Sequence, residues 1–259
     1  MPIRQALRKG TWPSAALTDA WRTIMPARDD PHGPLPPILL ALTVVTGLVD
    51  AFSYLMLGHV FVANMTGNVV FLGLALAGAG GFSIAASLVA LAAFSLGAVA
   101  GGRLSTRWGG HRGRLVAVVA AIEALLVAAS AGITATVSDP GSGVTGYVLI
   151  VLLGSALGTQ NAMARKLGVP DLTTTVLTLT ITGIFADGRL AGGATSKVGR
   201  RALSALAMFL GALAGARLVI RGNAPLVTIA AAVILLAVGV AATIQSRTDR
   251  PWTGARKAP

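Results

Sequence analysis

Residues Gly58–Asn68 read GHVFVANMTGN and lie between two strongly apolar runs of the sequence. The stretch is polar, has glycine at or near each end, and contains no lysine, arginine, aspartate or glutamate. Such a segment is either an ordinary loop in water or backbone that enters a membrane and returns to the same side. The number of membrane crossings, and hence the fold, depends on which of the two it is.

The composition is that of a polytopic α-helical membrane protein. Of the 259 residues, 54% are hydrophobic and only 12% are charged, and the mean hydropathy is +0.75. A soluble domain has about 25% charged residues. Six apolar blocks each approach the roughly 20 residues that cross a bilayer as a helix. The blocks are Leu35–Leu57, Phe82–Gly102, Leu115–Thr136, Val144–Ala164, Ala202–Ile220 and Ala224–Thr243.

Charge and cysteine content narrow the partners. The net charge of +12 comes from basic residues that gather in the tails and at the ends of the apolar blocks. Basic residues at such places orient a membrane protein and contact phospholipid head groups, so we expect membrane lipids as partners and no nucleic acid. The chain has no cysteine, which excludes disulfides and thiolate metal sites. Its three histidines are too scattered to indicate a metal site, and we expect no cofactor.

The chain contains an internal repeat. The stretches LGAVAGGRL, at Leu96–Leu104, and LGALAGARL, at Leu210–Leu218, are identical at seven of nine positions. Duplicated halves are a common way to build transporters and channels. We therefore divide the chain into a basic tail at 1–34, a first membrane repeat at 35–136, a second at 144–244, and a second basic tail at 245–259.

The segments upstream of the matched stretches also correspond. Gly58 follows Asp50 at the same spacing at which Gly168 follows Gln160. The sequence NMTGN after Gly58 then has a counterpart in TTTVLT, at Thr173–Thr178. In the first tail, helical spacing of apolar residues makes 14–25 either a short interfacial helix or part of a disordered basic tail.

The distribution of basic residues separates two topologies. If both polar segments are aqueous loops, there are eight spans and parallel repeats, and the 21 Lys and Arg residues divide 13 to 8 between the two sides. If both are re-entrant, there are six spans and inverted repeats, and the division is 19 to 2. Lys and Arg near span ends prefer the cytoplasm. We therefore expect about six spans, two re-entrant or broken segments, two inverted repeats, and both termini on the cytoplasmic side of the inner (plasma) membrane.

Re-entrant segments indicate a solute site. Irregular backbone at membrane depth is tolerated where protein buries it or water reaches it, and paired broken helices form solute sites in transporters. We expect such a site near the bilayer midplane, with half-helix N-termini that suit an anion or a polar neutral solute. The candidate binding residues are Asn64, Thr66, Asn68, Gln160, Asn161, Thr174, Thr175 and Thr178. The alternative is that these side chains only bond backbone or neighbouring helices.

Two carboxylates lie within apolar blocks. Asp50 is late in the first block, and Glu123, the only glutamate, is near the middle of the third. Intramembrane carboxylates are costly and often functional, so both are candidates for proton or ion coupling. The alternatives are that Asp50 caps the re-entrant turn and that Glu123 is a hydrogen-bonded packing residue. Asp171 suits the N-cap of the helix after it, and Arg103 and Arg217 either snorkel or pair with the carboxylates.

The two polar segments also carry a family resemblance. DAFSYLMLGHVFVANMTGNVVFLGLAL, at Asp50–Leu76, and GTQNAMARKLGVPDLTTTVLTLTITGIFAD, at Gly158–Asp187, resemble the two hallmark stretches of the DUF1275 or YoaK-like family. The resemblance covers roughly residues 35–244. It implies a bacterial integral membrane protein with about six helices, and it supplies neither a substrate nor catalytic residues.

Three function classes remain open. The favoured one is a channel or secondary transporter for a small polar or anionic solute. The second is a non-transporting interaction or regulatory protein, in which small residues such as those of Gly97–Gly102 pack helices or a second protomer of a homo-oligomer. The third, an intramembrane enzyme, lacks an HExxH motif, a cysteine and a G-x-S-x-G elbow, so we expect no enzymatic activity and no catalytic residues.

Overall fold

The computed structural model describes residues 12–27, 29–172, 174, 177–187, 197–247 and 252–254. Within these ranges the chain forms nine helices and no strand beyond an isolated β-bridge between His111 and Gly254. The helices are α2 (Trp12–Ile24), α3 (Leu35–Met56), α4 (Met65–Leu76), α5 (Ile84–Trp108), α6 (Arg112–Thr136), α7 (Gly143–Leu167), α8 (Leu177–Ala186), α9 (Val198–Ile220) and α10 (Ala224–Gln245).

Six helices, α3, α5, α6, α7, α9 and α10, are long and apolar enough to cross a membrane. The predicted all-α fold with six spans is therefore confirmed. Local caps fix where α5 and α6 begin. The Ser83 hydroxyl accepts a hydrogen bond from the Ala86 backbone N–H at the start of α5, and His111 does the same for Arg114 at the start of α6.

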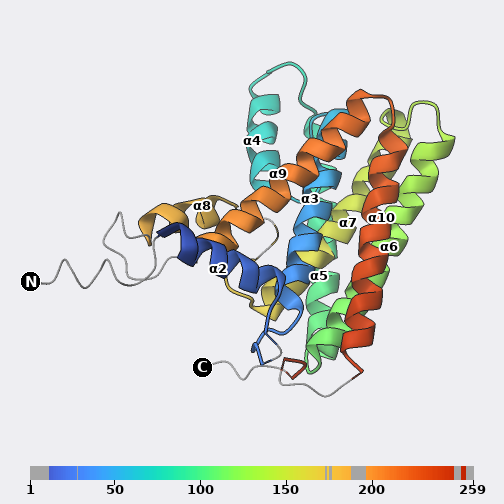
Figure 1. The fold of residues 1–259 in the computed structure, drawn as a ribbon. Coiled ribbons are helices and arrows are strands. Elements are labelled where there is room, and N and C mark those ends of the chain that lie inside the picture. The colour runs from blue at the N-terminus through green and yellow to red at the C-terminus, as the bar shows by residue number, and fades with distance from the viewer. Residues whose placement is uncertain are drawn as a thin grey trace, which may run out of the picture.

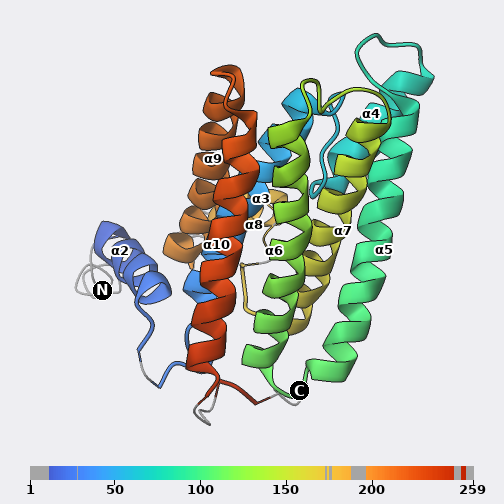
Figure 2. The same ribbon diagram turned by 90° about the vertical axis from the view of Figure 1, so that its right-hand side faces the viewer.

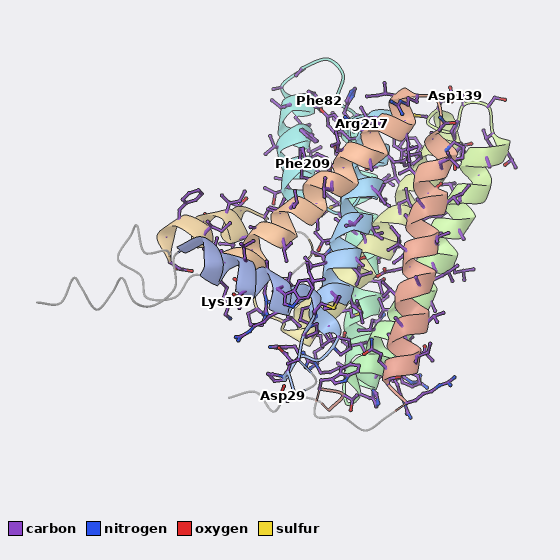
Figure 3. The ribbon with its side chains drawn as sticks, viewed as in Figure 1. Asp29, Phe82, Asp139, Lys197, Phe209 and Arg217 are labelled. Atoms are coloured by element: carbon purple, nitrogen blue, oxygen red, sulfur yellow. The ribbon has the colours of Figure 1, made fainter. Side chains whose placement is uncertain are left out.

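The spans form a bundle in which the connections alternate between two ends (Figure 1; Figure 2). The α5–α6 connection lies at one end, which we call the basic end because it carries Arg107, Arg112 and Arg114. The α6–α7 and α9–α10 connections lie at the opposite end (Figure 1), where Figure 3 shows Asp139 and Arg217. This arrangement agrees with the six-span division of basic residues.

The two short apolar helices interrupt the alternation. Helix α4 lies near the opposite end, where α3 finishes and α5 begins, and the chain through α8 joins α7 to α9 nearer the basic end (Figure 1; Figure 2). Each short helix therefore returns the chain to the side it came from. The first span of each half then runs in opposite directions, as inverted repeats require.

Close glycine contacts join the two halves. Gly97 and Gly101 of α5 press on α7, where a Cβ at Gly101 would lie 2.6 Å from the Thr159 carbonyl oxygen. Gly211 and Gly215 of α9 press on α3, where a Cβ at Gly215 would lie 2.7 Å from the Leu48 carbonyl oxygen. Small residues allow this approach between helix backbones. The matched stretches thus perform the same task, each holding the first span of the other half.

The packing corrects the predicted pairing of the halves by one residue. Gly47 of α3 lies against Ala212 of α9, and Gly158 of α7 lies against Ala98 of α5. Ala98 and Ala212 occupy the same place in the matched stretches, so Gly47 corresponds to Gly158. When the two halves are aligned in this way, Asp50 corresponds to Asn161 and not to Gln160. The equal spacing from Asp50 to Gly58 and from Gln160 to Gly168 gave the wrong correspondence, because Gly168 directly follows α7, whereas Leu57 separates the end of α3 from Gly58.

The described parts of both tails are ordered against the bundle. The first tail contains helix α2, as one of the two predicted alternatives required. This helix packs on α9, where the Arg200 backbone N–H donates to Asp19 Oδ2 at 2.9 Å. The apolar side chains that gave α2 its spacing are exposed: Leu17, Trp21, Ile24 and Met25. Their exposure suits a helix that lies in the membrane interface.

The basic end is closed by residues from distant parts of the chain. Arg112 donates its backbone N–H to the Thr253 carbonyl at 2.8 Å and its guanidinium to the Leu167 carbonyl at 2.6 Å. Trp252 is buried and leaves no room for a Cβ at Gly33. The C-terminal end of α7, the start of α6 and the linker before α3 are therefore fastened together.

Single-cysteine labelling tests the topology, because the chain has no cysteine of its own. Gly110 and Ser142 are exposed in the two connections of α6, one at each end of the bundle. In intact cells a membrane-impermeant thiol reagent should label the Ser142→Cys variant and label Gly110→Cys only after permeabilisation. Labelling of position 110 alone would contradict six spans with a cytoplasmic basic end.

Candidate functional site

A buried carboxylate holds the tip of the first broken segment. The two N–H groups of Val62 and Ala63 each donate to Asp50 Oδ1 at 2.9 Å, and the Asn64 side-chain amide donates to Asp50 Oδ2. Asp50 lies on α3, whereas its three partners directly precede α4. A negative charge at this place also complements the partial positive charge of the α4 N-terminus.

Asn68 closes the same turn from the other side. Its side-chain oxygen accepts the Phe61 backbone N–H at 2.8 Å, and its amide nitrogen donates to the Phe61 carbonyl at 2.6 Å. Asn68 is fully buried, whereas Thr66, in the same first turn of α4, is exposed. The polar side chains of NMTGN thus divide: Asn64 and Asn68 hold backbone in this conformation, and Thr66 faces outward.

An aromatic cluster packs beside this turn. Tyr54 stacks on Phe61 with ring centroids 5.3 Å apart, and Phe71 stacks on Phe82 at 5.2 Å. Gly67 is required here, because a Cβ at this position would lie 2.6 Å from the Phe61 ring. Aromatic residues can therefore pack tightly against the segment that carries the polar turn.

The second broken segment is held by an arginine. Arg201, in the first turn of α9, forms ion pairs with Asp171 at 2.9 Å and Asp187 at 2.8 Å and donates to the Gly183 carbonyl. A cation at the C-terminal end of α8 is the favourable arrangement for a helix dipole. Asp171 therefore pairs with Arg201, a role that the N-cap prediction did not include.

The threonines of the second segment have different environments. Thr174 is buried and has a left-handed backbone with φ of 64°, whereas Thr178 on α8 is exposed. Thr175 lies outside the described residues. A positive φ is uncommon for a branched residue and indicates a sharp turn at Thr174.

The polar residues of α7 connect to α3. Gln160 is buried, and its amide nitrogen donates to Thr46 Oγ1 at 2.9 Å, one helical turn before Asp50. The Gln160 side-chain oxygen is buried without a hydrogen-bond partner. Asn161 is half-buried and donates to the Leu157 carbonyl at 3.0 Å. The crossing of α3 and α7 thus carries polar groups from both halves.

Glu123 lies apart from these groups, on α6, a helix that packs on α10 and α7. Its exposed fraction is 1%, and its Oε1 atom has no hydrogen-bond partner. A buried polar atom without a partner is costly and calls for an explanation such as a functional role or a bound water.

The two short helices do not meet. Helix α4 packs on α5, helix α8 packs on α9, and within the described residues α4 and α8 make no contact with each other. The Asn64–Asn68 group and the threonines of α8 are therefore separate in this conformation, and a site shared between them stays a prediction. In the same described ranges, no three His, Asp or Glu side chains come close enough to hold a metal ion.

A cavity opens beside the start of the first segment. Its volume is about 180 Å³, and its walls come from the ends of α3, α5 and α7 at the opposite end of the bundle. Ser83 and Tyr147 supply polar groups, and Leu57, Ala86 and Ile150 supply apolar ones. Gly58, Gly141, Gly143 and Gly146 line the remainder. A Cβ at Gly58 or Gly143 would meet open space, whereas Gly141 and Gly146 allow backbone to pack closely around the cavity.

Six spans with a broken apolar segment in each half define a polytopic helical membrane protein. The chain belongs to the family described as "Protein of unknown function (DUF1275)", which matches residues 38–241. It is 36% identical over 160 residues to UPF0700 transmembrane protein YoaK of Bacillus subtilis (strain 168), a match that covers 59% of this chain and 68% of YoaK. No solved structure matches the chain.

Removal of the Asp50 carboxylate should loosen the first segment selectively. In Asp50→Ala, two buried N–H groups lose their acceptor, and each such loss costs about 1–3 kcal/mol. We expect the free energy of unfolding in detergent micelles to fall by roughly 3 kcal/mol. Hydrogen–deuterium exchange should accelerate at residues 60–68 and remain unchanged in α8.

Two variants serve as controls for this measurement. Arg201→Gln should have the reverse effect on exchange, with acceleration in α8 and none at 60–68. Asp139→Ala, in an exposed connection, should change the free energy of unfolding by no more than about 0.5 kcal/mol. Equal exchange changes in both segments of Asp50→Ala would show that the carboxylate stabilises the whole bundle and not this turn.

Proposed function

We propose that the protein is a channel or secondary transporter for a small polar solute in the bacterial inner membrane. The observation that carries the proposal is the buried Asp50 carboxylate, which holds the tip of a broken membrane segment whose first residue, Gly58, lines a cavity at one end of the bundle. Transporters commonly use broken segments of this kind, in inverted repeats, to place polar groups at membrane depth. Helix packing alone does not require such a segment.

The proposed orientation follows from charge. The basic residues of the α5–α6 connection gather at the basic end, Lys197 lies partway along the bundle, and Arg217 lies at the other end (Figure 3), where Arg221 follows α9. Because Lys and Arg near span ends prefer the cytoplasm, we place the basic end and both termini there. The cavity beside Gly58 then faces the outside of the cell.

The contacts of Asp50 favour an uncharged solute or a cation over an anion. The N–H groups at the tip of the first segment are the groups that would attract an anion, and the protein's own carboxylate already binds two of them. An anion would have to displace Asp50 or lie beside a negative charge. The proposed substrate class is therefore narrowed to small polar solutes such as alcohols, amides or monovalent cations.

Glu123 is the proposed coupling residue. Asp50 has three partners from the first segment, which leaves its carboxylate committed to a structural role in this conformation. Glu123 has a buried oxygen with no such partner, so it can accept and release a proton without breaking the fold.

The alternative is a membrane protein that binds partners and transports nothing. That function would use the small-residue faces to pack a second protomer. Gly97, Gly101, Gly211 and Gly215 instead pack helices within one chain. The remaining support for the alternative is the row of exposed apolar residues on α9, such as Leu206 and Phe209, which lipid would also cover.

A flux assay tests the transport proposal. Purified protein is reconstituted in liposomes, and the uptake of urea, glycerol and sodium formate is followed by stopped-flow light scattering. We expect urea or glycerol to enter faster than in empty liposomes, and formate to show no acceleration. If none of the three moves faster than in empty liposomes, transport of this class of small solute is wrong.

A matched pair of substitutions tests the route. Ala86 lines the cavity and is buried, whereas its neighbour Ala85 is exposed on the outer face of α5. Ala86→Leu should fill the cavity and reduce flux toward the rate of empty liposomes, and Ala85→Leu should keep the wild-type rate. Full flux in a folded Ala86→Leu variant would exclude the cavity as the route.

The coupling proposal has its own test. Solute uptake is measured with an imposed pH gradient, and pyranine inside the liposomes reports proton movement. Glu123→Gln should abolish the effect of the gradient because the amide has the shape of the acid but cannot carry a proton. An unchanged response in that variant would refute Glu123 as the proton carrier.

A further inference from the structure

A groove runs along the outer face of the bundle between α6 and α10. Its volume is about 490 Å³, and its walls are almost entirely apolar. The lining includes Ala117, Ala121, Leu236, Gly239, Val240 and Ile244. Gly239 forms part of the floor, and a Cβ built there would only touch Ala120 at 3.7 Å, so the groove is open space and not a tight helix contact.

The groove continues toward the basic end. A second hollow of about 390 Å³ extends it and shares Ala117, Thr243 and Arg247 with it. This hollow is lined also by Trp108, Arg114 and Ser246. The slot therefore leads into a hollow that is still mostly apolar but is lined by two arginines, Arg114 on α6 and Arg247 just beyond the end of α10.

Within the part of the chain that the structure describes, these two arginines have no acidic partner. Every ion pair among the described residues belongs to Arg201, and both Arg114 and Arg247 are exposed. An exposed arginine presents planar donors that suit phosphate oxygens. The pocket therefore offers positive charge that the described part of the protein does not neutralise.

The position of the groove identifies its occupant. It lies on the outer surface of two membrane spans, so its apolar part faces lipid chains and its basic part lies where head groups begin. Tryptophan is frequent at that level of a membrane, as is Trp108 here. Basic pockets between spans on the cytoplasmic side are known to receive anionic lipid head groups.

We propose that the α6–α10 groove binds one anionic phospholipid, with an acyl chain along Gly239 and the phosphate between Arg114 and Arg247. The site is distinct from Asp50 and from the cavity beside Gly58, and it does not depend on transport. A zwitterionic lipid fits the apolar slot equally well but carries no net negative charge for the two arginines.

Native mass spectrometry of the purified full chain tests this site. Dioleoyl phosphatidylglycerol or dioleoyl phosphatidylcholine is titrated into protein in a neutral detergent, and the bound fraction gives Kd. Each basic residue near the membrane surface adds enough attraction that the wild type should bind phosphatidylglycerol roughly tenfold to thirtyfold more tightly. The double variant Arg114→Gln, Arg247→Gln should lose this preference.

Three further measurements separate the outcomes. Arg217→Gln with Arg221→Gln, which removes two exposed arginines at the opposite end, should leave the preference intact. Gly239→Leu should fill the slot and weaken binding of both lipids while both arginines remain. Inorganic phosphate at millimolar concentration should not displace phosphatidylglycerol.

Three results would overturn the proposal. Equal binding of the two lipids by the wild type would show that the groove holds only bulk lipid. Equal loss in the two double variants would show a general effect of charge. Displacement by phosphate would show a site for a free anion.

Discussion

The need to satisfy backbone N–H groups inside a membrane dominates this structure. A bilayer provides no water to bond them, so a chain that reverses at membrane depth must bring its own acceptors. Asp50 and Asn68 supply these acceptors for Phe61, Val62 and Ala63. The carboxylate that α3 presents at that level stabilises the turn, and the turn leads directly into the start of α4.

The second constraint is that each half packs one of its helices against the first span of the other half. Helix α5 of the first half packs on α7 of the second, and α9 of the second packs on α3 of the first. The glycines that allow this approach leave no room for a methyl group, so neither half has a complete packing surface without the other. The two broken segments then lie toward different ends of one bundle (Figure 1).

Features that depend on residue type could be predicted from the sequence. Contacts that involve backbone groups, or residues far apart in the sequence, could not. The lengths of the apolar blocks predicted the spans, and the basic residues predicted how they connect. Asp50 and Asn64 were both singled out, and the alternative that Asp50 caps the re-entrant turn describes its contacts. Its other two partners could not be named, because they are backbone groups that any residue provides. Arg201 was counted only as a basic residue, since nothing in the sequence shows that Asp171 and Asp187 come together around it. The two aspartates that flank the second broken segment, Asp171 and Asp187, were the available signal for such a contact.

The two halves hold their broken segments with different residues, so the inverted repeat is not truly symmetric. In a perfect inverted duplication, a twofold rotation would exchange the two segments together with every bond that holds them. Here Asp50 faces its segment as a carboxylate where the other half has the amide of Asn161, and the second segment is held by Arg201 instead. A movement of one segment must therefore break bonds that a movement of the other does not, so the two ends of the bundle are energetically unequal.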